Sequence, residues 1–245
     1  MRKIKLTIEY DGTNYHGWQI QKNGITVQET IEKAISKLFD MQLRLVGCSR
    51  TDVGVHAYGQ VAHILTNSSI PGDKICYAIN NLLPEDIVIK HSEDVSEDFH
   101  ARYSSKGKKY RYLFYNGAHE SALMRNRACH VRPVLNLDHM QKASKYFIGQ
   151  HDFAAFQATG GQVRSTIREI YGIDVFKRED NLIGLEVSGN GFLYNMVRII
   201  AGTLIYVGIG KIEVNEIPKI IESLDRTKAG KTAPAQGLYL MEIYY

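Results

Sequence analysis

Hydrophobic and polar residues alternate along the first ten positions of the chain. Apolar side chains occupy positions 4, 6 and 8, polar ones lie between them, and the alternation ends at Asp11 and Gly12. A period of two is typical of a half-buried strand, and Asp-Gly is typical of the turn that follows one. We therefore predict a strand over residues 3–10.

A helical period follows this strand. Thr26 and Glu29 have the spacing of a capping box, in which two side chains bond backbone N–H groups at the start of a helix. The next apolar residues recur on one helical face. They are Val27, Ile31, Ala34, Ile35, Leu38 and Phe39. We predict a helix that starts after Thr26.

The same two patterns continue to the end of the chain. Strands are predicted at residues 43–46, 60–66, 87–89, 109–115, 167–176, 182–188 and 238–244. Helices are predicted at residues 74–83, 138–147 (capped by Asp138), 192–207 (strongly apolar and buried) and 217–224. Strands and helices in each half predict an α+β fold of two similar lobes, with mainly antiparallel sheets covered by helices. We place the lobes at residues 1–105 and 106–245.

Composition narrows the class of protein. Of the 245 residues, 44% are hydrophobic, which is enough for a folded core. No apolar run approaches the roughly 18 residues of a membrane helix, and we see no signal peptide, so we expect no membrane. The three cysteines lie far apart, which fits neither a disulfide framework nor a zinc ribbon. Their number and spacing favour the reducing cytoplasm.

The positive charge is concentrated in one region. The chain carries a net charge of +4, but residues 100–132 hold eight Lys and Arg against one Glu, a net +7. Five Tyr and Phe side chains are interleaved with these cations. Cations follow phosphates and aromatic rings stack on bases, so the mixture suits a nucleic acid with exposed bases. The alternative is an ordinary solvated strand and loop.

A loop over residues 47–57 gathers polar groups among small residues between two predicted strands. Arg50 and Asp52 are two positions apart, so in an extended chain they share a face. The guanidinium would keep the carboxylate ionised and oriented, and such a carboxylate can act as a nucleophile or general base. The alternative is a surface turn with one salt bridge.

Two further residues are candidates for chemistry. Arg198 lies within the apolar segment 192–207, so its guanidinium must either reach water along the helix edge or meet an acid or phosphate. Asp52 is a candidate for the acidic partner of Arg198. Tyr110 shares one face of its predicted strand with Tyr112 and Phe114. That face is either part of the core or a platform for stacking.

The other polar groups do not have the spacing of a metal or cofactor site. The histidines lack ligand spacing, and the glycine pairs match neither a P-loop nor a dinucleotide fingerprint. We therefore expect no metal and no cofactor. These expectations leave an acid-catalysed enzyme without cofactor, or a plain binding module.

Residues 50–57 resemble the signature loop of the TruA family of tRNA pseudouridine synthases. Other similar segments follow in the family's order over essentially the whole chain. They are residues 10–19, 99–102, 108–112, 149–153, 192–198 and 232–238. Cys48, Ser49 and Val53 depart from the family's usual small residues, but they are conservative in size and leave the chemical groups intact.

The resemblance implies a role for each candidate residue. Asp52 matches the catalytic aspartate that initiates cleavage of the uridine N-glycosidic bond, and Arg198 matches an arginine that pairs with it. Tyr110 matches a tyrosine that stacks on the target base and is a candidate for proton transfer. Arg50 matches an arginine that helps to flip the base and hold RNA. The other substrate-binding candidates are His56, Lys108, Lys109 and Arg111.

The resemblance also implies a substrate and an assembly. The family isomerises uridines 38 to 40 of the tRNA anticodon stem-loop, as a homodimer of the pseudouridine synthase fold, with the active site in the cleft between the lobes. The target base must leave its stack to be modified. Three choices remain open: another structured RNA as substrate, a non-catalytic RNA-binding relative, and attack by Asp52 on the sugar against removal of its 2′ proton.

Overall fold

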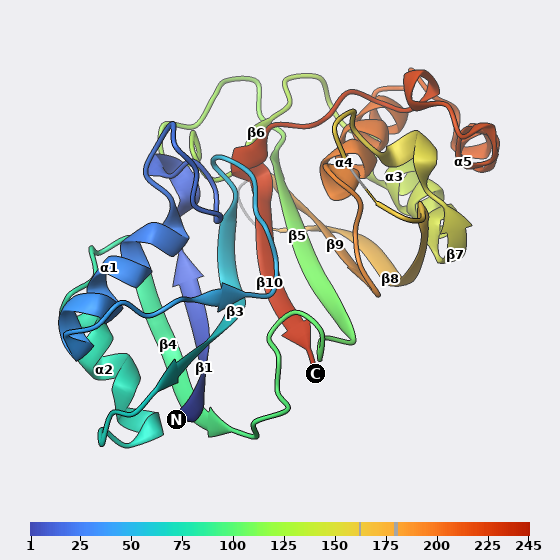
Figure 1. Ribbon diagram of the computed structural model, residues 1–245. Coiled ribbons are helices and arrows are strands. Elements are labelled where there is room, and N and C mark those ends of the chain that lie inside the picture. Colours follow the sequence, from blue (N-terminus) through green and yellow to red (C-terminus); the bar gives the residue numbers. More distant parts are fainter. Residues whose placement is uncertain (162, 179–180) are drawn as a thin grey trace. The chain divides into compact units, whose positions relative to one another are not determined.

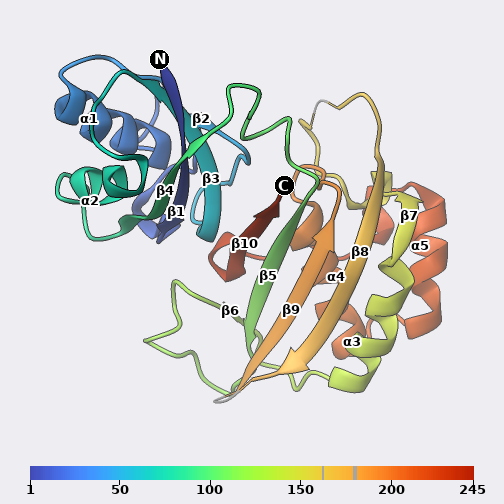
Figure 2. The same cartoon turned by 90° about the horizontal axis from the view of Figure 1, so that it is seen from below.

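The computed structural model of the protein describes residues 1–161, 163–178 and 181–245. It divides into two compact units, residues 1–106 with 239–245 and residues 107–238 (Figures 1 and 2). The last strand therefore belongs to the unit that holds the first 106 residues, whereas the sequence division places it in the C-terminal lobe. In the described residues, no helix has the length and apolar character to cross a membrane.

The first unit is built on a mixed sheet. Its strands are β1 (Arg2–Tyr10), β2 (Val46–Gly47), β3 (His56–Thr66), β4 (Ile87–Val95) and β10 (Leu238–Tyr244). The strand order is β4-β1-β3-β10, and β2 pairs with β3. β1 is antiparallel to β3 and β4, while β10 is parallel to β3. The alternation predicted for the first strand is confirmed, because Ile4, Leu6 and Ile8 are all buried.

Helix α1 (Val27–Phe39) begins where the capping pattern predicts. The Thr26 hydroxyl accepts a hydrogen bond from the backbone N–H of Glu29 at 3.3 Å. The predicted apolar stripe is buried at four positions, Val27, Ile31, Ala34 and Ile35. Burial of this stripe is the main stabilisation of the helix, because capping and propensity alone do not hold a short helix in water.

Helix α2 (Ile75–Asn80) is shorter than the predicted helix over residues 74–83. It ends early because Asn80 turns its side chain to β4. The amide of Asn80 donates to the Ile89 carbonyl at 3.0 Å and its oxygen accepts from the Ile89 N–H at 2.8 Å. The Asn80 side chain thus bonds both backbone polar groups of Ile89, as a neighbouring strand would. The helix ends here, before Pro84.

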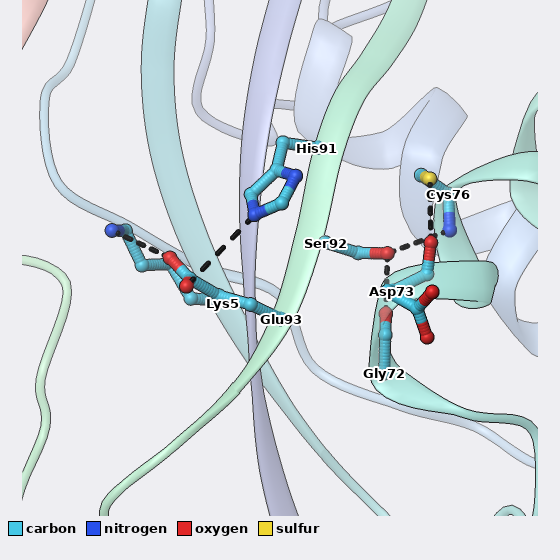
Figure 3. A network of polar contacts seen from close by, with 7 residues as sticks. All are labelled: Lys5, Gly72, Asp73, Cys76, His91, Ser92 and Glu93. Carbon is cyan, nitrogen blue, oxygen red and sulfur yellow. Dashed lines mark hydrogen bonds and ion pairs between the residues drawn. The ribbon is translucent and has the colours of Figure 1, made fainter.

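Polar contacts join β4 to its neighbours (Figure 3). The buried Ser92 hydroxyl donates to the Gly72 carbonyl at 2.5 Å and accepts from the backbone N–H of Cys76 at 2.9 Å. The next residue, Glu93, points to the other face and pairs with Lys5 of β1 at 2.9 Å. Successive residues of β4 therefore fix the start of α2 and the pairing with β1.

The second unit has a sheet of mostly antiparallel strands. Its strands are β5 (Gly107–Tyr115), β6 (Cys129–His130), β7 (Gly149–Asp152), β8 (Ile167–Lys177) and β9 (Leu182–Gly189). Its helices are α3 (Leu137–Ser144), α4 (Met196–Gly208) and α5 (Ile217–Ser223). The order β5-β9-β8-β7 is antiparallel throughout, and β6 pairs with β5 in parallel. The predicted α+β class with mainly antiparallel sheets is confirmed.

Two helix starts differ from the prediction. α3 is capped by Asn136, whose side chain accepts from the His139 N–H at 3.0 Å, so Asp138 lies inside the first turn. α4 begins at Met196 instead of residue 192, because Asn195 adopts a left-handed backbone with φ of 60°. This conformation breaks a helix, and Asn tolerates it better than most residues.

Candidate active site

The loop that carries Asp52 is fixed to β3 at its start. The backbone N–H of Cys48 donates to the Val61 carbonyl at 2.8 Å. Gln60, fully buried, brackets the next residue: its amide donates to the Ser49 carbonyl at 2.7 Å and its oxygen accepts from the Ser49 N–H at 3.2 Å. A side chain thus replaces the strand pairing at the point where the loop leaves the sheet.

The segment after β1 supports the loop from a second side. The Tyr10 hydroxyl lies 2.7 Å from the Thr51 hydroxyl in a buried hydrogen bond. The Trp18 N–H donates to the Thr51 carbonyl at 3.1 Å. Gly17, with φ of +81°, passes so close that a Cβ there would lie 2.5 Å from the same carbonyl. Only glycine fits this approach. The residue before Asp52 is therefore held by the segment after β1, and Ser49 is held by Gln60 of β3.

Asp52 follows this clamped residue and is half-buried. Its carbonyl accepts from the Val55 N–H at 3.2 Å in a turn that Gly54 completes with φ of +76°. Arg50 is exposed and, within residues 1–161, 163–178 and 181–245, forms no ion pair. The alternative of a surface turn with a salt bridge between Arg50 and Asp52 is therefore not observed, and the charge of Arg50 is available for another anion.

His56 begins β3 and is only 3% exposed. Its Nδ1 accepts a hydrogen bond from the Gly12 N–H at 3.1 Å, and its ring stacks on Tyr239 with centroids 4.7 Å apart. The Asp11 carboxylate lies at the same distance of 3.1 Å from Nδ1. One nitrogen cannot accept from Gly12 and donate to Asp11 at once, so the presence or absence of a proton on Nδ1 selects between the two. These contacts give His56 a supporting place beneath the loop.

In the second unit, Tyr110 lies on β5 on the same face as Lys108, Tyr112 and Phe114. Its ring is 8% exposed and meets the edge of Phe192 at 5.2 Å with an interplanar angle of 87°. The prediction that Tyr110 shares a face with Tyr112 and Phe114 is confirmed by their burial. Phe192 fixes the plane of the Tyr110 ring.

Lys109 and Arg111 lie on the opposite face of β5. Both bind Glu186 of β9, Lys109 at 2.6 Å and Arg111 through two nitrogens at 2.5 and 2.8 Å. Partial burial alone would raise the pKa of Glu186, but the hydrogen bonds from Lys109 and Arg111 outweigh it and hold this pKa below its usual value. Of the cations proposed from this strand, Lys108 shares the face of Tyr110, and the other two belong to a network between strands.

Arg198 is half-buried on α4 and is held from two sides. Its Nε donates to the Ala233 carbonyl at 2.8 Å and its Nη1 donates to the Asn195 side chain at 2.8 Å. The Ala233 N–H donates back to the Arg198 carbonyl at 3.0 Å. These bonds fix the direction of the guanidinium. Arg198 therefore does not simply extend along the helix edge into water.

The tight packing beside Arg198 explains this order. A Cβ at Gly202 would lie 1.7 Å from the Lys231 carbonyl, so α4 and the segment before β10 touch backbone to backbone. The Thr203 hydroxyl accepts from the Gly230 N–H at 2.9 Å at the same contact. Sequence reasoning did not assign supporting roles to Tyr10, Gln60, Phe192 and Asn195. Of these contacts, only the one between Asn195, which precedes α4, and Arg198 three residues later is local in the sequence.

The structure thus places the candidate residues in two groups. Arg50, Asp52 and His56 come together on one loop and strand of the first unit, and Tyr110, Lys108 and Arg198 belong to the second. Within each unit the side chains are braced by buried hydrogen bonds and tight backbone contacts. An aspartate on a doubly anchored loop, a ring on a strand and a fixed arginine are the groups expected of an enzyme that acts on a base and its sugar.

Comparison with known proteins identifies the class. Residues 6–104 and 143–245 match the family model described as tRNA pseudouridine synthase, so the chain belongs to this family. Relatives match over their full length and over 100% of this chain. They are tRNA pseudouridine synthase A of Ruminiclostridium cellulolyticum (76% identical) and of Acetivibrio thermocellus (58%), and tRNA pseudouridine synthase A 2 of Clostridium perfringens (50%). The predicted family is confirmed.

Proposed function

We propose that this protein isomerises uridine to pseudouridine at positions 38 to 40 of the tRNA anticodon stem-loop. The observation that carries the proposal is Asp52 on its doubly anchored loop, in a chain that is 76% identical over its whole length to a tRNA pseudouridine synthase A. The loop, the Tyr110 ring and Arg198 supply a carboxylate, a stacking surface and a fixed cation, which are the groups that this isomerisation uses.

Asp52 initiates the reaction at the sugar. Either its carboxylate attacks C1′, or it removes the 2′ proton; in both routes the bond from N1 to C1′ breaks. The freed uracil turns and C5 bonds to C1′. This bond displaces the Asp52 carboxylate in the first route, and in the second the 2′ proton returns to the sugar. C5 then loses its proton and N1 takes one up. The product has the atoms of the substrate, so no oxidant or second substrate enters the balance.

The other residues hold the base and the carboxylate. The target uridine leaves the stem so that its sugar can reach Asp52. Tyr110, with its plane set by Phe192, stacks on the flipped uracil. Arg198, oriented by Asn195 and Ala233, pairs with Asp52, and Arg50 takes part in base flipping. In this proposal the reaction takes place in a cleft between two similar α+β lobes.

Substrate RNA is held by cations outside the reaction centre. Lys108 lies on the Tyr110 face and is the β5 cation best placed for a phosphate, whereas Lys109 and Arg111 contribute through the field of their pair with Glu186. We further propose that two copies of the chain form a homodimer in the cytoplasm, and that His56 contributes by supporting the loop that meets the RNA.

The test is substitution of the carboxylate. Asp52→Asn should abolish release of tritium from tRNA labelled at C5 of uridine, because isomerisation frees that hydrogen and a carboxamide neither attacks nor takes a proton. Binding of tRNA should survive. Asp73→Asn, at a side chain that is 62% exposed in the same unit, is the matched control and should retain full activity. Tritium release by the Asp52→Asn protein at the unaltered rate would refute the proposal.

A further inference from the structure

A pocket of about 350 Å³ lies beside the Asp52 loop, wholly within the first unit. Its volume is at the lower end of the range of about 300–1,000 Å³ that is typical of small-ligand sites. Arginines line it from three separate segments: Arg44 before β2, Arg50 in the loop and Arg102 before β5. No Asp or Glu is among the lining residues. The pocket therefore has the charge of a site for an anion.

None of these three arginines is neutralised elsewhere. Within the described residues, Arg44, Arg50 and Arg102 form no ion pair with a carboxylate, and Arg102 only lies over the Tyr103 ring at 5.8 Å. By contrast, Arg111 of β5 is engaged with Glu186. Like charges that converge without an acidic partner repel each other, so such an arrangement favours a bound polyanion.

A buried hydroxyl gives an independent sign of a ligand. Ser49 lines the same pocket and is 3% exposed, yet its Oγ has no hydrogen-bond partner among the described residues. Leaving a buried hydroxyl without a partner costs about 1–3 kcal/mol, so such groups mark places where another molecule completes the bonding. The Ser49 backbone is fully bonded to Gln60, which leaves the hydroxyl as the group without a partner.

The remaining walls suit a nucleoside. The Nδ1 of His100 accepts from the N–H groups of Arg102 and Tyr103 at 3.1 and 3.2 Å, which leaves the proton on Nε2 as a donor. The Tyr103 ring is 77% exposed and lies 4.3 Å from the His100 ring. Trp18 also lines the pocket, and its ring packs against Gly47. An exposed aromatic ring next to arginines is a stacking surface for a base.

We propose that this pocket binds one nucleotide of the substrate RNA next to the target uridine, with its phosphate among Arg44, Arg50 and Arg102. The site rests on the proposed function, because Arg50 both lines the pocket and stands two residues from Asp52. Ser49 and His100 donate hydrogen bonds to the nucleotide, and Tyr103 stacks on its base. By holding this neighbouring nucleotide, the pocket positions the RNA strand so that the target uridine lies near Asp52.

The chain offers a direct probe of this site, because Trp18 is its only tryptophan. Unmodified tRNA is titrated into the Asp52→Asn protein while tryptophan fluorescence and tRNA anisotropy are recorded at several salt concentrations. The test variant adds Arg44→Gln and Arg102→Gln. The matched control adds Lys37→Gln, which removes an exposed charge of the same unit on α1. Circular dichroism checks that each variant folds.

The double arginine variant should bind tRNA roughly 100-fold more weakly, since each charged contact is worth about tenfold. Its plot of log affinity against log salt should be shallower by about 1, because the pocket neutralises one phosphate. The saturable change in Trp18 fluorescence on addition of tRNA should be lost in the double arginine variant. The Lys37→Gln control should retain it. Ser49→Ala should weaken binding several-fold without altering the salt slope, because it removes a bond and no charge.

Equal affinity and equal salt slope in the double variant and the Lys37→Gln control would overturn the site. This outcome is separate from failure of the proposed function, which would show as no tritium release from tRNA by the unaltered protein. With Asp52 restored, the double variant should raise KM about as much as it weakens binding and leave kcat within roughly twofold, since the pocket positions RNA and holds no reacting group.

Discussion

The imidazole of His63 on β3 is 6% exposed, and its Nδ1 accepts from the Ala101 N–H at 3.2 Å. Burial, with the neighbouring His100 and Lys3 in support, lowers the pKa of His63 to about 4. The ring is therefore neutral in the folded protein at neutral pH. In the unfolded chain the same group titrates near its ordinary value of about 6.5.

Stability should consequently fall as the solution is acidified. Above about pH 6.5, His63 is neutral in both the folded and the unfolded protein. Between about pH 6.5 and 4, only the unfolded chain binds a proton at this residue. The free energy of unfolding should therefore decrease by up to about 3 kcal/mol over this range. His63→Gln should flatten this part of the pH profile in urea unfolding. His91→Gln, at a ring that is 59% exposed, is the control and should leave the slope in place. A wild-type profile that is flat over this range would contradict the assignment.

At the scale of elements, Glu186 links β9 to β5 through Lys109 and Arg111. Glu186→Gln should lower the free energy of unfolding by about 1–2 kcal/mol at pH 7, because two partly buried cations lose their partner. The lowered pKa of Glu186 sets the pH dependence. The ionised Glu186 carboxylate stabilises the folded protein above about pH 4.3, the ordinary pKa of Glu. This stabilisation is lost as the pH falls through the lower pKa of Glu186 in the folded protein. The unaltered and Glu186→Gln proteins should therefore have equal free energies of unfolding below that pH.

Glu169→Gln is the control for that experiment, because Glu169 is exposed on the adjacent β8. Chemical unfolding should give the control the stability of the unaltered protein at both pH values. A deficit for Glu186→Gln that persists unchanged at low pH would show that shape, and not charge, links the strands.

Elements with local signals were predictable from the sequence, and those set by distant contacts were not. Thr26 caps α1 as its spacing with Glu29 indicates, and the last strand has the predicted bounds. β3 begins at His56 instead of residue 60, because pairing with β10 extends it. Asn80 ends α2 through bonds to Ile89, a partner that no periodicity reveals.

The same distinction applies to the candidate site. Asp52 and Arg198 stand out by residue type, a carboxylate among small residues and a guanidinium in an apolar helix. Their supports join positions far apart, as in the bond between Tyr10 and Thr51, 41 residues apart, or that between Arg198 and Ala233, 35 apart. Spacing along one chain carries no information on such pairs without the topology that brings them together.

At the scale of the whole molecule, the chain ends in the unit where it begins. β10 adds a parallel partner to β3 and buries Leu240. The carbonyl of Met241 lies so close to Gly59 that a Cβ there would be 2.4 Å away. The Tyr245 hydroxyl donates to the Ala101 carbonyl at 2.7 Å. The support of the Asp52 loop therefore includes residues 239–245, which are far from the loop in the sequence.

Leu240→Ala should test this dependence, because loss of a fully buried leucine costs about 2–5 kcal/mol. Amide hydrogen exchange should accelerate in β1 and β3 of the first unit and stay slow in β8 and β9 of the second. The neighbouring Glu242→Ala, at an exposed position of the same strand, should change neither. Equal acceleration in all four strands would mean that the two units unfold as one. Faster exchange confined to β1 and β3 would mean that the Asp52 loop can lose its support while the Arg198 helix stays folded.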